Sequence, residues 1–141
     1  MNTTFNIELP HDLATGFRDF FHGYLETMFW SSTQDSGDPL ERDFGFPDLA
    51  PEAHARAFAD CLSFWLTHSP WITYETRIGS TYGHTVDALA GHDFWLTRNG
   101  HGAGFWDGDW ADYPAERMDK ASEAFAQQYA YVGDDGKVYL S

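Results

Sequence analysis

Cysteine, lysine and long apolar runs are nearly absent from this sequence, and the absences exclude several classes of protein. The single cysteine, Cys61, rules out an internal disulfide. No apolar run approaches the roughly eighteen residues of a membrane-spanning helix. The first residues, MNTTFNIELPHD, contain no basic stretch followed by an apolar one, so we expect no secretory signal. These absences predict a soluble protein of the cytoplasm without a membrane anchor.

Basic residues are scarce throughout the chain. Eight Lys and Arg stand against 22 Asp and Glu, which gives a formal net charge of −14. A surface this negative repels nucleic acid and anionic membranes, so we expect direct binding to neither. It attracts basic proteins instead, including the DNA-binding grooves of enzymes. The simpler alternative is that the acidity serves only solubility.

Aromatic residues, by contrast, are plentiful. Phe, Trp and Tyr make up 18% of the chain and all hydrophobic residues together 43%, which is enough apolar area for a packed core. The length of 141 residues fits one domain. Since no repeat, linker or boundary is visible, we expect a single globular domain over residues 1–141.

Apolar residues at helical spacing predict three helices, over residues 11–29, 51–69 and about 114–128. In the first, Gly16 and Gly23 are seven residues apart and lie near one face, where another backbone can approach closely. The expected apolar stripes are Leu13, Phe17, Phe20, Phe21, Tyr24 and Met28, then Phe58, Cys61, Leu62, Trp65 and Leu66, then Met118, Ala121, Phe125 and Tyr129. Residues 71–90 are ambiguous: WITYET (71–76) fits a strand, and TVDALA (85–90) fits a short helix turn.

After Gly91 the apolar period changes to two, and the stretch HDFWLTRNGHGAGFWDGDW (92–110) predicts a β-hairpin. Its turn is the pair Asn99-Gly100, the strongest short hairpin signal. A second hairpin is expected near the C-terminus, with its turn at Asp135-Gly136. The predicted fold class is therefore α+β, about three helices packed on an antiparallel sheet built from two hairpins.

A two-residue turn would fix the register of the first hairpin. The facing pairs on one side of the sheet would be Arg98–His101, Leu96–Ala103, Phe94–Phe105 and His92–Asp107. On the other side, Trp95 would lie against Gly104, which gives the glycine a packing role. His92 and His101 would be about 20 Å apart along the ribbon, too far to share a metal ion. We therefore expect neither a metal nor a cofactor.

Possible chemistry of the hairpin is confined to its two ends. His92 and Asp107 would form an imidazole–carboxylate pair at the base, of the kind found in general-base sites. Arg98 and His101 would lie together at the tip. These four residues are the weak catalytic candidates, although such pairs more often have a structural role.

Five aspartates are candidate binding residues for a basic partner. Asp107, Asp109 and Asp112 lie in DGDWAD, and Asp134 and Asp135 lie in GDDGK. The first group is faintly similar to a calcium loop but lacks the later glycine and the bidentate glutamate. The alternative interpretation is that these residues form ordinary helix starts and turns.

Three stretches together resemble one family of proteins. They are AGHDFWLTRNGHGAGFWDGD (90–109), YVGDDGKVYL near the C-terminus, and the arrangement GYLE…WSST…D…PL after the first helix. The family consists of small acidic proteins of tailed bacteriophages and mobile elements, generally without an assigned activity. It has no established catalytic residues to carry over. The resemblance therefore implies only a setting, a phage or plasmid product in the cytoplasm of a bacterial host.

In that setting we favour an interaction protein, not an enzyme, that binds and modulates a host or defence protein with a basic surface. One version is a partial DNA mimic: a globule of this length spans about 35–40 Å, over which duplex DNA carries on the order of 22 phosphates. The alternative is a small enzyme or ligand-binding protein that uses the two ends of the hairpin. It predicts a cavity at one end, with helix side chains converging there. A third possibility is a virion or assembly component.

Overall fold

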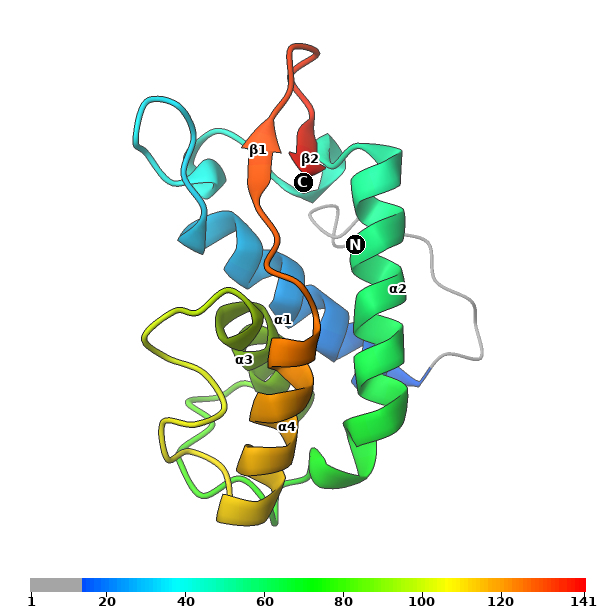
Figure 1. Ribbon diagram of the computed structural model, residues 1–141, viewed down its shortest axis with the longest axis vertical. Helices are drawn as coiled ribbons and strands as arrows, with labels where there is room; N and C mark the ends of the chain where they lie inside the picture. The colour runs from blue at the N-terminus through cyan, green and yellow to red at the C-terminus, as the bar shows by residue number, and fades with distance from the viewer. Residues whose placement is uncertain (1–13) are drawn as a thin grey trace.

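The computed structural model describes residues 14–141 and arranges most of them as helices around one aromatic core (Figure 1). The α-helices are α1 (Thr15–Ser31), α2 (Pro51–His68), α3 (Val86–Arg98) and α4 (Asp112–Ala124). The strands are β1 (Ala130–Val132) and β2 (Val138–Leu140), and the connections contain three short 3-10 helices, η1 (Leu40–Arg42), η2 (Phe46–Asp48) and η3 (Ser69–Trp71). The fold class is α+β, as predicted. The described chain has four α-helices and one hairpin, however, in place of three helices and two hairpins.

The first predicted hairpin is wrong, because residues 92–98 belong to α3 and residues 99–110 form a loop. The hydroxyl of Thr85 caps the start of this helix by accepting a hydrogen bond from the backbone N–H of Ala88, at 3.1 Å. All residues from 93 to 98 are buried. A helix buried on every side has no polar face, so its sequence does not show the helical period.

The pair Asn99-Gly100 ends α3 instead of turning a hairpin. Gly100 has a φ of +70°, and its N–H donates to the carbonyl of Thr97 at 3.2 Å. The next N–H, of His101, donates to the carbonyl of Leu96 at 3.0 Å. These two bonds form a Schellman motif. Glycine adopts a positive φ readily, and both a tight β-turn and the end of a helix require one. The pair Asn-Gly is therefore compatible with either structure.

The facing pairs predicted across that hairpin do not form. They were Arg98–His101, Leu96–Ala103, Phe94–Phe105 and His92–Asp107. Gly104 gives room to Thr97 and not to Trp95: a Cβ at Gly104 would lie 2.3 Å from the Thr97 hydroxyl oxygen. That oxygen accepts a hydrogen bond from the backbone N–H of Phe105 at 3.1 Å, which holds the loop against α3.

The closest packing in the molecule is the crossing of α1 and α3. A Cβ at Gly23 would lie 2.1 Å from the carbonyl oxygen of Ala88, and one at Gly91 would lie 2.0 Å from the carbonyl oxygen of Phe20. Each helix therefore presents a glycine to the backbone of the other. The close approach predicted at Gly23 is confirmed, and its partner is the glycine that sequence analysis placed before a strand.

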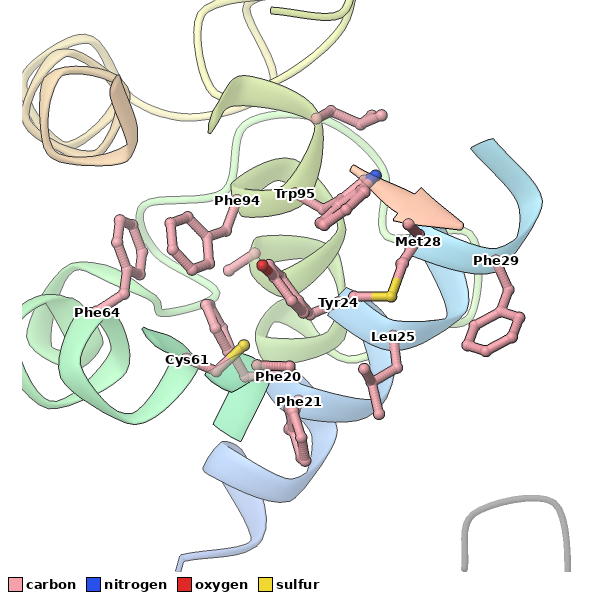
Figure 2. Packing of buried hydrophobic residues seen from close by; sticks show 14 of the residues in the cluster. Phe20, Phe21, Tyr24, Leu25, Met28, Phe29, Cys61, Phe64, Phe94 and Trp95 are labelled. Atoms are coloured by element: carbon pink, nitrogen blue, oxygen red, sulfur yellow. The ribbon is translucent and has the colours of Figure 1, made fainter. Parts of the chain in front are cut away.

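Aromatic side chains fill the space around this crossing (Figure 2). Phe64 of α2 stacks on Phe94 of α3 with ring centroids 4.3 Å apart, and Tyr24 of α1 lies 5.2 Å from Phe94. Leu13 and the predicted start of the first helix at His11 lie outside the described residues, but the rest of the α1 stripe is buried as predicted. Cys61 is also buried in this core.

The stripes of the other two predicted helices need correction. The buried face of α2 is Ala53, Ala57, Cys61, Phe64 and His68. Phe58, Leu62 and Trp65 lie at its edge, and Leu66 is 62% exposed. The third predicted helix is α4, which ends at Ala124, so Tyr129 lies beyond it and is exposed.

The second predicted hairpin is present, with Tyr131 opposite Tyr139 in an antiparallel register. Its strand β2 is held against the start of α2, because the N–H of Ala50 donates to the carbonyl of Val138 at 2.9 Å. A two-stranded sheet is only marginally stable alone, so the contact with the start of α2 stabilises the hairpin. Within residues 14–141, no helix combines the length and apolar character needed to cross a membrane.

We predict that Gly91→Ala lowers the free energy of unfolding by about 3 kcal/mol, because the new methyl group would collide with the α1 backbone. The measurement is chemical denaturation followed by circular dichroism. Gly102→Ala is the matched control, since a Cβ there meets nothing within 4 Å. Equal stability of the two variants would contradict the close helix crossing.

Candidate functional site

A cavity of about 500 Å³ opens where α1 and α3 cross. Four parts of the chain line it: α1, the segment around residues 77–84, α3 and the loop at 107–109. The titratable side chains on its walls are Glu26, Arg77, Tyr82, His84, His92, Asp93, Asp107 and Asp109. This concentration of ionisable groups makes the cavity the candidate site.

Asp93 is the buried centre of this site. The indole N–H of Trp110 donates to its Oδ2 at 2.7 Å, and its Oδ1 lies 3.1 Å from Nδ1 of His92. The Asp93 side chain is 8% exposed, whereas that of His92 is 35% exposed. A buried carboxylate thus orients an imidazole that lines the cavity, an arrangement able to support proton transfer.

Arg77 is the single Lys or Arg on the cavity wall, and it is already engaged. Its side chain is 6% exposed, with Nη1 3.9 Å from Asp93 and Nη2 3.8 Å from Asp109. The guanidinium lies over the indole of Trp110, 5.0 Å from the ring centroid. Backbone hydrogen bonds fix this geometry, since the N–H groups of residues 78 and 79 both donate to the carbonyl of Asp109. Two carboxylates and an aromatic face therefore hold one guanidinium.

Asp107 and Asp109 form the outer acidic wall. Burial raises the pKa of Asp109, and the charge of Asp107 and a hydrogen bond with its side chain raise it further, while Arg77 lowers it. Because the two carboxylates repel each other, a cation that approaches both of them is stabilised. This wall is thus suited to hold a proton or to bind a positive charge.

His92 and Asp107 were predicted to lie together, and they do line one cavity. The direct pairing is wrong, because the carboxylate beside His92 is that of its neighbour Asp93. Sequence reasoning missed Asp93, Arg77 and Glu26 as site residues. A signal was available for Asp93, an acidic residue directly before the apolar residues FWL. No local signal pointed to the other two.

Arg98 and His101 are separated, and Arg98 serves the core. Its Nη1 donates to Asp60 at 2.9 Å and to the Tyr24 hydroxyl at 3.1 Å. Its Nε and Nη2 both donate to the carbonyl of Ala126. His101 is exposed and lines another cavity, between residues 31–35 and β1. Arg98 therefore ties the end of α4 to α1 and α2 and is not the tip of a site.

The five candidate binding aspartates do not share one surface. Asp107 and Asp109 line the cavity, and Asp112 begins α4. Asp134 and Asp135 lie in the β1–β2 turn, at the opposite end of the molecule from the start of α4 (Figure 1). The hydroxyl of Tyr139 donates to Oδ2 of Asp135 at 2.6 Å, so this second group has a local structural role.

Among residues 14–141, no group of three or more His, Cys, Asp or Glu side chains is arranged to hold a metal ion. Comparisons with protein-family models, curated proteins and solved structures give no match to this chain. The site is therefore interpreted from its own geometry.

We predict that Arg98→Lys lowers the free energy of unfolding by at least about 2 kcal/mol, because an ammonium group cannot satisfy the same buried acceptors. Arg117→Lys is the control, since that guanidinium lies at the exposed ring of Tyr113, and we expect a change within about 0.5 kcal/mol. Thermal or urea denaturation gives both values. An Arg98→Lys variant as stable as the wild type would contradict the structural role.

The turn at Asp135 gives a prediction about titration. The hydrogen bond to Asp135 raises the pKa of Tyr139 to about 12, because loss of the hydroxyl proton would place two negative charges together. Asp135→Ala should return this pKa towards its ordinary value, while Asp134→Ala should leave it raised. Tyrosine-selective NMR during an alkaline titration measures it. Equal pKa values in the two variants would contradict the assigned bond.

Proposed function

We propose that this protein is an acidic interaction protein that binds and modulates a host or defence protein with a basic surface, in the cytoplasm of a bacterial host. The resemblance to phage and mobile-element proteins supports the setting. The net charge of −14 supports the choice of partner. Such a charge speeds encounter with basic surfaces and disfavours nucleic acid and anionic membranes.

One observation carries the proposal: two of the eight Lys and Arg side chains are buried, whereas Asp93 is the one buried residue among the described Asp and Glu. The side chains of Arg77 and Arg98 are only 6% and 3% exposed. Two other cations pair with acids on the surface, Arg42 with Asp38 at 2.7 Å and Lys120 with Glu116 at 3.7 Å. The other six cations are exposed, but acidic side chains outnumber them on the exterior, which therefore stays strongly negative.

The distribution of carboxylates supports a partial DNA mimic as the finer version. Acidic side chains lie at the hairpin turn, around the cavity and on α4, so the negative charge extends over the length of the molecule. A basic groove built for a duplex would meet negative charge along much of the length of the molecule.

The test is capture of partners from host lysate with tagged full-length protein, at low and at high salt. We expect a protein with a basic surface, lost at high salt and displaced by duplex DNA, because exposed charges are screened. A variant in which Asp107, Asp109, Asp134 and Asp135 are changed to Asn should capture less of it. A partner that stays bound equally well in high salt and to this variant would overturn the electrostatic proposal.

The second candidate is a small enzyme or ligand-binding protein, and one observation favours it. Asp93 orients His92 at the wall of a cavity to which α1 contributes side chains, which is the convergence that this alternative requires. Its chemistry would be proton transfer by the imidazole, with Asp107 and Asp109 as acidic neighbours. His92→Gln would then abolish turnover of a substrate while leaving capture of the basic partner unchanged.

A further inference from the structure

We infer that the cavity between α1 and α3 binds an arginine side chain of the basic partner. This inference rests on the proposed function and names the chemistry by which the partner is recognised. It assigns to Trp30, Glu26 and Asp107 the contacts with the incoming guanidinium.

The chain already binds one guanidinium in this cavity. Arg77 lies over the indole of Trp110, with the carboxylates of Asp93 and Asp109 at 3.9 and 3.8 Å. Aromatic faces and paired carboxylates are the groups that suit a planar, delocalised cation. The inner half of the cavity thus already places a guanidinium between an aromatic face and two carboxylates at ion-pair distance.

The outer half of the cavity also carries carboxylates and aromatic rings, but no cation is paired with these carboxylates. Glu26 and Asp107 are exposed, and neither pairs with a Lys, Arg or His of residues 14–141. Trp30 lines the same cavity with 43% of its surface exposed, and its ring lies 5.9 Å from that of His92. Tyr82, at 82% exposure, lines the same cavity. Two carboxylates and two rings are left facing solvent.

Charge and size select the ligand. The walls carry four carboxylates, those of Glu26, Asp93, Asp107 and Asp109, and Arg77 is the one Lys or Arg among the lining residues. An anionic ligand is therefore repelled. A volume of about 500 Å³ falls within the range of small-molecule sites and leaves room for a side chain with its adjoining backbone. Arginine is favoured over lysine because its planar head stacks on an indole and bonds carboxylates in pairs.

The test is an NMR titration of the intact protein with a short blocked peptide that contains one arginine, followed at the indole N–H of Trp30. Matched peptides carry lysine or the neutral isostere citrulline. We expect saturable binding of the arginine peptide, several-fold weaker binding of the lysine peptide and none of the citrulline peptide. Equal binding of the citrulline peptide would overturn the inference, as would failure of the arginine peptide to saturate.

Variants locate the contact. Glu26→Gln and Asp107→Asn should each weaken arginine binding about tenfold, since each removes a charge-assisted bond, and Trp30→Ala should weaken it about two- to fivefold. For the variant lacking Trp30, the shifts of the Asp107 and Asp109 backbone amides replace the indole signal. Trp106→Ala removes an indole that is 58% exposed elsewhere, and Asp134→Asn removes a distant carboxylate, so both controls should bind as the wild type does.

The two proposals fail in different ways. If lysate capture stays salt-sensitive while Trp30→Ala and Glu26→Gln bind the partner like the wild type, the arginine site is wrong and the acidic interaction protein stands. If the arginine peptide saturates the cavity but no basic protein is captured at low salt, the proposed function fails. Thermal melting of each variant confirms that it is folded before binding is compared.

Discussion

The approach of two backbones at Gly23 and Gly91 is the constraint on which the rest of the structure depends. No side chain larger than hydrogen fits at either position, so α1 and α3 meet more closely than ordinary helix pairs. This contact fixes which residues project on either side of the crossing. On one side it brings Tyr24 against Phe94 in the core. On the other it brings the α1 residues Glu26 and Trp30 to the same cavity as the α3 residues His92 and Asp93.

Two buried arginines extend this arrangement to the irregular parts of the chain. Arg98 binds the carbonyl of Ala126 and so fixes the segment that leads from α4 into β1. Arg77 binds Asp93 and Asp109 and so fixes the loop that closes the cavity. A buried ion pair adds little net stability, but it allows few alternative arrangements. Using two of the eight cations as internal ties adds to the excess of negative charge on the exterior, which links the architecture to the proposed partner.

Local signals in the sequence were sufficient to predict a helix or strand where one face of that element is exposed. The α1 stripe, the extent of α2 from Pro51 and the C-terminal hairpin all follow from periodicity and turn residues. Local signals were insufficient to predict the structure of residues 92–110. Burial of residues 93–98 removes the polar face of the helix, and Asn99-Gly100 is compatible with both a β-turn and a helix end. Arg77 lies 16 residues before Asp93 in the chain, in a segment with no regular pattern. Only tertiary structure brings the two together.

The proposed arginine site would allow a protein with so much diffuse charge to select among basic partners. Spread carboxylates attract every basic surface alike and mainly affect the rate of encounter. Selectivity requires a site at which a ligand of the wrong charge or shape leaves carboxylates unpaired. The outer wall of the cavity is such a site, because Glu26 and Asp107 pair with no cation among the described residues. Asp109 is already engaged by Arg77, so a second cation adds to a preformed arrangement. The glycine crossing that orders the core therefore also prepares the surface for recognition.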